Sequence, residues 1–414
     1  MKSRRTSVLF AAVLVAVLAA IAGSVQAAVA AGPVVTIWTD QDRKTAVTQV
    51  ANQWASARGA TVNIVIKNFG DIRDNLGTVA AADAPDVIVG AHDWTGQLAA
   101  NGLVQPIRPK AATLAQFPKY TLDAFSYGTG VKNLYGAPVA VENIGLVVNT
   151  GLVKVPTSWA QLESEALAYK KKVKASFGIA VQQGTGGDAY HMYPFFSGLG
   201  GYIFGVTKAG TLNPSDVGVA NKTFLKNASL IDKWNREGLI NAKVDSSTAQ
   251  NAFLKKQAAF WVTGPWNIDT LNKSGLKYTV IQVPKIATTS APFLGVQGFM
   301  VTKYASTHGV DSLAQDLVSS YMMTPDAQAL LASGNNRYPA NTAAGKKVTD
   351  PVLAQFGKAS AGGVPMPNIP QMANVWSDLG AAWVRSTKGP GSMKASRSFT
   401  GAARAITLKI RAAG

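Results

Sequence analysis

Three apolar runs near the start of the sequence read VVTIW at residues 34–38, TVNIVI at residues 61–66 and DVIVGA at residues 86–91. Each run is rich in β-branched side chains, which is typical of strands buried in a parallel sheet. Between these runs, residues 44–57 and 71–82 space their apolar side chains as helices do. The alternation of strand and helix predicts an α/β fold with a ligand site at the carboxyl ends of the strands.

A second series of strands and helices follows a pair of apolar strands at residues 134–149, which are split at 141–143. Helices are expected at residues 157–172, 188–199, 222–237 and 247–256, and strands at 177–181, 258–263, 278–283 and 293–302. The last strand is expected to cross back to the first domain. Because no Gly/Ser-rich linker stands at either crossing, the chain is predicted to have two lobes joined by hinge strands.

The N-terminus has the pattern of a secretory signal peptide. A positive stretch (Lys2, Arg4 and Arg5) precedes an apolar segment at 8–21, and small residues then allow cleavage after Ala27 or Ala30. A general secretory signal and a twin-arginine signal both fit, and an uncleaved anchor is the alternative. Cleavage after residue 27 leaves 414 − 27 = 387 residues, which are too many for one ordinary core and predict two domains.

Cysteine is absent and the chain is basic. Without cysteine there is no disulfide, no thiol nucleophile and no cysteine-ligated metal site. Lysine and arginine exceed aspartate and glutamate by 40 − 22 = 18, and removal of the three basic signal residues leaves +15. Because the charges are dispersed, a basic surface is favoured over binding of nucleic acid or another polyanion, which stays an alternative.

Several aromatic residues lie beside glycine, proline or a carboxylate at expected element ends. Trp266 ends the tract TGPW, Tyr190 ends GGDAY, Trp94 follows Asp93, and Trp376 follows the proline-rich tract MPNIPQM at residues 366–372. A tryptophan is more often a core residue than a ligand contact. At these positions, however, the backbone can approach a ligand and an aromatic face can stack on a sugar ring.

Carboxylates at element junctions form a second set of candidates: Asp40, Asp42, Asp93, Glu142 and Asp188. They could accept hydrogen bonds from ligand hydroxyls, or two of them could form the acid and nucleophile of a glycoside hydrolase. For Asp93 and Asp188, helix capping is the simpler interpretation. His92 and His191 match neither a zinc motif nor a catalytic triad, and the sequence has no P-loop and no G-x-S-x-G motif.

Tracts spread along nearly the whole mature sequence resemble the maltose/maltodextrin-binding proteins that serve ABC importers. They are VTIW at 35–38, APDVI at 84–88, AHD at 91–93, YGAPVAVE at 135–142, GGYIF at 200–204, VGV at 217–219, GPW at 264–266 and MPNIPQM at 366–372 with Trp376. The resemblance implies a two-lobed periplasmic-binding-protein fold, each lobe a mostly parallel sheet flanked by helices. It divides the chain into an N-terminal lobe at 33–140 and 293–345 and a C-terminal lobe at 141–292 and 346–414.

The same resemblance implies a non-enzymatic function, namely capture of maltose or maltodextrin in the cleft between the lobes for delivery to an ABC importer. Another oligosaccharide, such as a cyclodextrin or a different disaccharide, is the alternative ligand. No cofactor is implied, and a monomer that partners the importer's membrane subunits is expected. Because no cysteine can carry a lipid anchor, the protein is expected to be retained in the periplasm.

By position, the resemblance assigns sugar stacking to Tyr190, Trp266 and Trp376, and hydroxyl recognition to Asp42, Arg43, Asp93, Glu142 and Asp188. Asp188 stands where the family commonly has glutamate, and Arg43 where it commonly has lysine. Gly90 stands where close relatives carry a stacking tryptophan, and Trp94 replaces their arginine. We therefore hypothesise that the aromatic platform has moved four residues along the chain, to Trp94.

Overall fold

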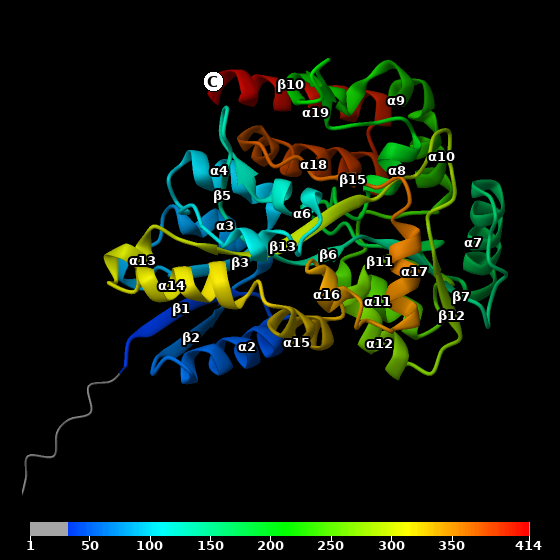
Figure 1. Ribbon diagram of the computed structural model, residues 1–414. Helices are drawn as coiled ribbons and strands as arrows, with labels where there is room; N and C mark the ends of the chain where they lie inside the picture. The colour runs from blue at the N-terminus through cyan, green and yellow to red at the C-terminus, as the bar shows by residue number, and fades with distance from the viewer. Residues whose placement is uncertain (1–31, 414) are drawn as a thin grey trace, which may run out of the picture. The chain divides into compact units, whose positions relative to one another are not determined.

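The apolar runs of the sequence become strands of two mixed β-sheets in the computed structural model, which describes residues 32–413 (Figure 1). The expected signal peptide at residues 1–27, with both candidate cleavage sites, lies outside this range. Within the described range, no helix is both long and apolar enough to cross a membrane.

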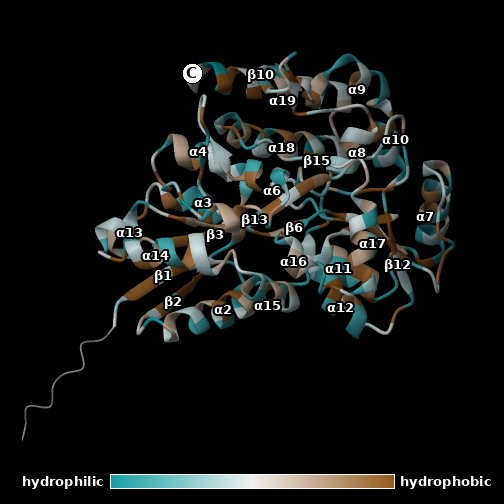
Figure 2. Cartoon of the chain, in the orientation of Figure 1, coloured by the Kyte–Doolittle hydropathy of each residue, from teal (hydrophilic) through white to brown (hydrophobic). Residues whose placement is uncertain are grey.

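The larger sheet has seven strands, ordered β14-β6-β13-β3-β1-β2, with β15 paired to β13. They are β1 (Val34–Thr39), β2 (Thr61–Ile66), β3 (Val87–Ala91), β6 (Ala137–Glu142), β13 (Phe293–Val301), β14 (Tyr338–Pro339) and β15 (Val364–Pro365). Strand β1 runs parallel to β2 and β3, which confirms the βαβαβ prediction. Strands β1, β2 and β13 are coloured as largely hydrophobic in Figure 2. Strand β2, however, lies at the edge of the sheet and has no fully buried residue, so the expectation that it is a buried strand is wrong.

The second sheet has four strands in the order β12 (Tyr278–Ile281), β7 (Gly145–Asn149), β11 (Phe260–Thr263) and β8 (Ile179–Val181). Strand β7 is antiparallel to both β12 and β11, and only β11 and β8 are parallel. The α/β fold class is confirmed, but this sheet is not mostly parallel as expected. The chain enters it through β7 and leaves it through β12, so these two neighbouring strands must run in opposite directions.

The chain passes between the two sheets by direct strand-to-strand connections. Only residues 143–144 separate β6 from β7, and residues 282–292 separate β12 from β13. The outgoing strand β6 and the returning strand β13 pair antiparallel in the larger sheet. The strand crossing predicted for residues 293–302 is therefore confirmed. Val34–Gly414 form one compact unit, and the domain boundaries expected from the sequence remain a prediction.

Helices flank both sheets. The longer ones are α2 (Lys44–Ser56), α3 (Phe69–Leu76), α7 (Trp159–Val173), α10 (Ser229–Glu237), α11 (Ser246–Leu254), α15 (Pro325–Asn335), α17 (Pro351–Ala359), α18 (Trp376–Thr387) and α19 (Ala395–Ala413). Shorter ones that matter below are α4 (Thr95–Ala100), α6 (Lys119–Ala124), α8 (Tyr193–Gly198), α9 (Lys222–Asn227), α14 (Asp311–Asp316) and α16 (Thr342–Gly345).

Three predicted helices are shorter or divided in the structure. The helix expected at 71–82 ends at Leu76, before a separate 3-10 turn at Ala81–Asp83. The helix expected at 188–199 begins only at Tyr193, because Pro194 lacks an N–H group and fits best in a first helical turn. The helix expected at 222–237 is divided into α9 and α10 at Ala228. The helix expected at 157–172 is confirmed as α7, and it is capped by Ser158, whose side chain accepts a hydrogen bond from the Gln161 N–H group.

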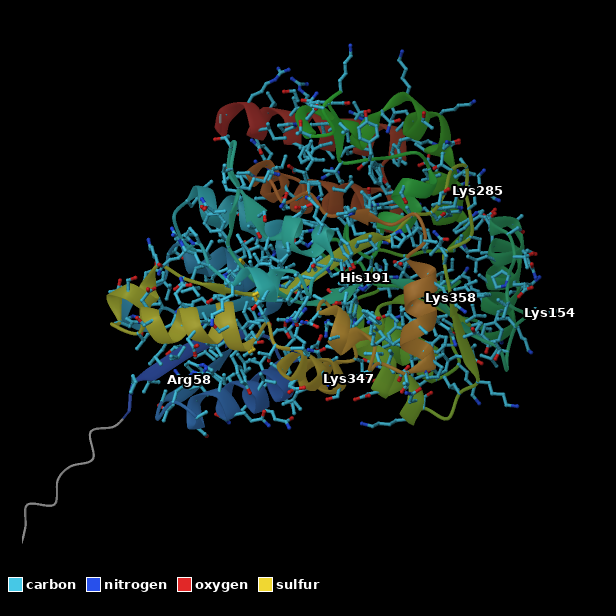
Figure 3. The ribbon with its side chains drawn as sticks, viewed as in Figure 1. Arg58, Lys154, His191, Lys285, Lys347 and Lys358 are labelled. Atoms are coloured by element: carbon cyan, nitrogen blue, oxygen red, sulfur yellow. The ribbon has the colours of Figure 1, made fainter. Side chains whose placement is uncertain are left out.

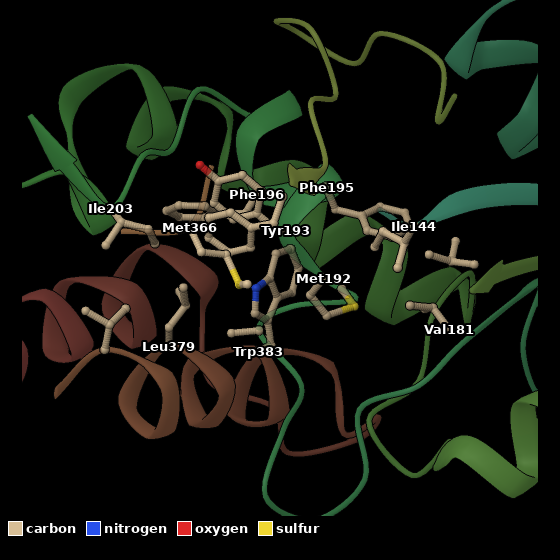
Figure 4. Packing of buried hydrophobic residues seen from close by; sticks show 14 of the residues in the cluster. Ile144, Val181, Met192, Tyr193, Phe195, Phe196, Ile203, Met366, Leu379 and Trp383 are labelled. Carbon is tan, nitrogen blue, oxygen red and sulfur yellow. The ribbon is translucent and has the colours of Figure 1, made fainter. Parts of the chain in front are cut away.

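An aromatic core holds α8, α18 and α19 together, and α18 and α19 lie side by side in Figure 1. Figure 4 shows Tyr193, Phe196, Leu379 and Trp383 packed in this region. Phe399 of α19 adds an edge-on contact to Trp383, with 5.1 Å between ring centroids. Because burial of several large side chains is worth several kcal/mol, α18 is held firmly, and its first residue is Trp376.

Candidate ligand-binding cleft

One cleft of about 510 Å³ gathers residues from distant parts of the chain. Its walls include all nine side chains singled out from the sequence: Asp42, Arg43, Asp93, Trp94, Glu142, Asp188, Tyr190, Trp266 and Trp376. The volume lies within the range of about 300–1,000 Å³ that is usual for small-molecule sites. Ligand binding by these residues remains a prediction.

Strand ends bring three of the acidic residues to the cleft. Asp40 directly follows β1, Asp93 lies in the 3-10 turn after β3, and Glu142 is the last residue of β6. Strands β1 and β3 are parallel neighbours, so their carboxyl ends meet at one edge of the sheet. The sheet therefore places these side chains together before any ligand is present.

Asp40 fixes the position of Arg43. Its Oδ1 accepts a hydrogen bond from the Arg43 N–H group at 3.0 Å, and its Oδ2 pairs with the guanidinium. The guanidinium carbon also lies 4.7 Å from the centroid of the Phe69 ring. Burial and the nearby Arg337 charge lower the pKa of Arg43. Asp42, in contrast, is exposed at the cleft wall.

Glu142 is a buried carboxylate with two protein donors. Its Oε1 accepts from Gln297 Nε2 at 2.5 Å, and its Oε2 accepts from Arg337 Nε. Burial by itself disfavours the charged form, but the Arg337 and Arg43 charges outweigh burial and lower the pKa of Glu142. The carboxylate is therefore held charged, with one bond already made to each oxygen.

Asp93 and Trp376 connect the end of β3 to the start of α18. The indole Nε1 of Trp376 donates to Asp93 Oδ2 at 3.0 Å. Burial raises the pKa of Asp93 to about 6, against smaller opposing effects of Arg73 and of this hydrogen bond. Asp93 thus loses its proton closer to neutral pH than an exposed aspartate does.

Asp188 is engaged mainly with its own neighbourhood. Its Oδ1 accepts from the His191 N–H group at 2.9 Å, and its Oδ2 contacts both Gln182 Nε2 at 2.6 Å and His191 Nδ1 at 2.9 Å. The helix-cap interpretation of Asp188 is wrong, because α8 begins only at Tyr193 and has no side-chain cap. The first bond instead closes a turn between Asp188 and His191. Although burial opposes ionisation, these His191 contacts lower the pKa of Asp188. Figure 3 shows His191 toward the middle of the fold.

The predicted aromatic residues form a continuous wall with Phe293. Phe293 stacks on Tyr190, with 6.2 Å between centroids and 19° between planes, and contacts Trp376 edge-on at 5.7 Å. Tyr190 in turn lies 6.4 Å from Trp266. A Cβ atom at Gly264 would fall 2.1 Å from the Trp266 ring, so the indole lies directly on this glycine. Phe293 is fully buried and supports the wall from behind.

Trp94 occupies the space that a side chain at position 90 would need. A Cβ atom at Gly90 would fall 2.0 Å from Trp94 Cζ3. The indole also packs on Phe69, with 4.7 Å between centroids, and is only 3% exposed. The glycine at 90 and the tryptophan at 94 are thus sterically linked, as required if one aromatic platform has replaced another.

A family model described as bacterial extracellular solute-binding protein matches residues 49–355, which is more than half of the chain. The chain belongs to this family. Its similar relatives include a maltodextrin-binding protein of Bacillus subtilis (strain 168), 29% identical over 369 residues, covering 83% of this chain and 82% of the relative.

Two further relatives are similar to this solute-binding protein over most of their length. A galactooligosaccharide-binding protein of Bacillus subtilis (strain 168) is 26% identical over 370 residues, covering 85% of this chain and 84% of the relative. A maltotriose-binding protein of Pyrococcus abyssi (strain GE5 / Orsay) is 26% identical over 342 residues, covering 80% and 72%. These relatives are binding proteins, which agrees with the expectation that the chain is not an enzyme.

The structure adds several residues to the site of this solute-binding protein that sequence reasoning missed. They are Lys67, Phe69, Arg73, Gln182, Gln297 and Arg337. Asp40 and His191 also line the cleft, and both were considered from the sequence without being assigned to the site. Gln297 and Arg337 carry no local signal, because Gln297 lies within an apolar strand and Arg337 follows helix α15 in a polar stretch.

Proposed function

We propose that this solute-binding protein captures an oligosaccharide in the cleft and delivers it to the membrane subunits of an ABC importer. Maltose or maltodextrin is the first candidate ligand, and a galactooligosaccharide or another oligosaccharide is the alternative. The observation that supports the proposal most is that an aromatic wall lies beside charged side chains, most of which already form ion pairs or hydrogen bonds within the protein. No covalent chemistry is required.

The charge balance of the cleft favours a neutral polar ligand. Its walls carry five acidic side chains (Asp40, Asp42, Asp93, Glu142 and Asp188) and four basic ones (Arg43, Lys67, Arg73 and Arg337). The most buried charges already have partners, as in the Asp40–Arg43 and Glu142–Arg337 pairs. An ionic ligand would have to compete with these pairs, whereas hydroxyl groups can use the hydrogen-bonding capacity that remains.

The aromatic wall supplies the apolar half of sugar recognition. Tyr190, Trp266 and Trp376 present ring surfaces beside polar groups, and a pyranose ring has the same combination of an apolar face and polar edges. The resemblance of the sequence and two of the named relatives favour an α-linked glucose oligomer. The galactooligosaccharide-binding relative keeps the alternative open.

The cellular setting is part of the proposal. Residues 1–27 have the pattern of a cleaved secretory signal, so we place the protein in the periplasm as a monomer. Exposed lysines such as Lys154, Lys285 and Lys347 lie in three different loops, and Figure 3 shows them well apart from one another. This dispersion supports a generally basic surface over a nucleic-acid-binding face.

The deciding experiment is isothermal titration of the purified protein with maltotriose and galactotriose, with sucrose and cellobiose as controls. Saturable one-to-one binding of maltotriose alone, with no glucose released afterwards, is the expected result. Selective binding of galactotriose would replace the ligand but keep the transport role. Release of glucose from maltotriose would instead support a glycoside hydrolase, and no response to any oligosaccharide would contradict the proposed ligand class.

A further inference from the structure

Arg337 lies in the wall of the cleft with only 3% of its surface exposed. The residue sits between α15 and β14, far in sequence from the other charged side chains of the site. The antiparallel pairing of β14 with β6, in which Tyr338 lies opposite Val141, brings it to Glu142, which is 195 positions away. A buried arginine at a cleft wall is uncommon unless it is paired, and here it is paired on one side only.

The bonds of Arg337 leave part of its guanidinium free. Nε donates to Glu142 Oε2, and Nη1 donates to the Asn335 carbonyl at 3.1 Å. A guanidinium has five N–H groups, so these two bonds use two of them. Among residues 32–413, Nη2 has no hydrogen-bond partner. Three N–H groups therefore remain for a ligand.

The free donors lie beside an aromatic face. The guanidinium carbon of Arg337 is 5.5 Å from the centroid of the Trp266 ring. A sugar ring that stacks against this part of the wall would bring its edge oxygens near the guanidinium. Planar guanidinium groups bind oxygen acceptors with fixed geometry, which suits them to distinguish one oxygen position from another.

Glu142 has the opposite character. Each of its oxygens already accepts a bond from the protein, one from Gln297 and one from Arg337. Burial would lower the pKa of Arg337, but the contact with Glu142 outweighs burial and raises the pKa, so the guanidinium stays charged. The carboxylate therefore holds the arginine in place and compensates its charge.

We propose that Arg337 is a direct ligand-binding residue, donating hydrogen bonds to an oligosaccharide oxygen beside Trp266, and that Glu142 is a positioning residue acting through Arg337. This inference rests on the proposed oligosaccharide-binding function. It transfers to Arg337 the hydroxyl recognition that the resemblance assigned to Glu142. Arg337 comes from a segment in which no sequence motif predicted a binding residue.

The test is titration of Arg337→Lys with maltotriose or galactotriose, whichever the wild type binds more tightly. Lysine keeps a positive charge for Glu142 but lacks the planar fork, so we expect at least about tenfold weaker binding. Arg58→Lys is the matched control, because Arg58 also pairs through Nε with a carboxylate, that of Asp316, and also lies 5.5 Å from a tryptophan ring, that of Trp54. Arg58 lies outside the cleft, so its variant should bind as the wild type does.

A double-mutant cycle separates positioning from direct contact. If Glu142 acts through Arg337, adding Glu142→Gln to Arg337→Lys should weaken binding by less than about twofold. Additive losses would show that Glu142 contacts the ligand independently and would overturn its positioning role. If Arg337→Lys does not fold, the double variant Arg337→Gln/Glu142→Gln removes both buried charges and should show the same loss.

The failures of the two proposals are distinguishable. If the wild type binds none of the oligosaccharides, the proposed function fails, and this inference fails with it. If the wild type binds and Arg337→Lys binds equally well, the proposed function stands and the role of Arg337 is overturned. Thermal unfolding of each variant without ligand shows whether a loss of affinity reflects a loss of folding.

Discussion

Gly90 and Trp94 set the shape of one part of the cleft wall through a single steric contact. If Trp94 is the displaced stacking platform, Trp94→Ala should weaken oligosaccharide binding by at least about tenfold, or about 1.4 kcal/mol. Gly90→Ala should also weaken it, because the new Cβ would lie 2.0 Å from the indole and force the ring to move. Titration calorimetry measures both effects.

Gly70 offers a matched control for the Gly90 variant. It also lines the cleft, but a Cβ atom there would meet nothing within 4 Å. Gly70 lies in α3, where alanine is the better helix former, so Gly70→Ala should fold and bind normally. Unchanged affinity in both Trp94→Ala and Gly90→Ala would refute the displaced platform.

Asp93 should make the protein less stable as the pH rises. Its folded pKa of about 6 lies above the ordinary value of 3.8, so the folded state retains a proton that the unfolded state has lost. The stability from that proton is present at low pH and is lost as the pH rises through about 6. Asp93→Asn, which stays neutral, should therefore be more stable than the wild type above pH 6, by about 3 kcal/mol.

Urea unfolding of both proteins between pH 4 and pH 8 measures this difference directly. Asp83→Asn is the control, because Asp83 is exposed and should leave the pH profile of the wild type unchanged. A constant difference in stability between Asp93→Asn and the wild type over this range would contradict the raised pKa.

At the scale of elements, the proline-rich loop at 366–372 is tied to the last residues of α6 and to the strand that follows it. The Asn368 side-chain amide donates to the carbonyl oxygens of Asp123 and Ala124 at 2.9 Å and of Ser126 at 3.1 Å. Helix α4 approaches the same loop so closely that a Cβ at Gly96 would fall 2.3 Å from the Asn368 carbonyl oxygen. This loop leads directly into Trp376.

Asn368→Asp should loosen that attachment. A carboxylate cannot donate to the three carbonyls and is repelled by them, so we expect a loss of about 1–3 kcal/mol in unfolding free energy. Asn374→Asp, in the 3-10 turn at Pro370–Asn374, is the control for adding one negative charge nearby. Equal stability of the two variants in urea would show that the Asn368 bonds contribute little.

At the scale of the whole molecule, His92 joins three segments that are distant in sequence. Its Nε2 contacts the Met366 carbonyl at 3.0 Å, and its Nδ1 lies 3.1 Å from the Val296 N–H group. A carbonyl only accepts and an N–H group only donates, so the ring must be neutral, with its proton on Nε2. Burial lowers the pKa of His92 to about 4.

Between about pH 4 and pH 6.5, His92 is protonated in the unfolded state but not in the folded state. The stability of the folded state therefore falls as the pH drops from about 6.5 to 4. The contribution of Asp93 to stability changes in the opposite direction over nearly the same pH range. In the wild type, the two contributions should therefore partly cancel. In Asp93→Asn, acidification should cost about 3 kcal/mol, measured by urea unfolding at pH 7, 5.5 and 4.5. Stability that does not change over this range would contradict a neutral, buried His92.

The local elements could be predicted from the sequence because their signals are local. The β-branched runs at 34–38 and 61–66 became β1 and β2, and the helix expected at 157–172 became α7. The predicted start of α8 was wrong, because Pro194 lies within the expected helix and fits only in its first turn. The prediction that candidate residues would gather at strand ends was useful because parallel strands share one carboxyl edge.

The sequence by itself determined the α/β fold class, the strand crossings and nine of the residues that line the cleft. Tertiary structure alone decided the mixed direction of the strands and the hydrogen-bond partners of those residues. Glu142 and Arg337 meet across 195 positions, and Asp93 and Trp376 across 283. The periodicity of apolar residues indicates which face of an element is buried. It does not indicate which charged residue, distant in sequence, will pair with a buried charge on that element. Whether a carboxylate is free for a ligand or already engaged therefore depends on the folded chain.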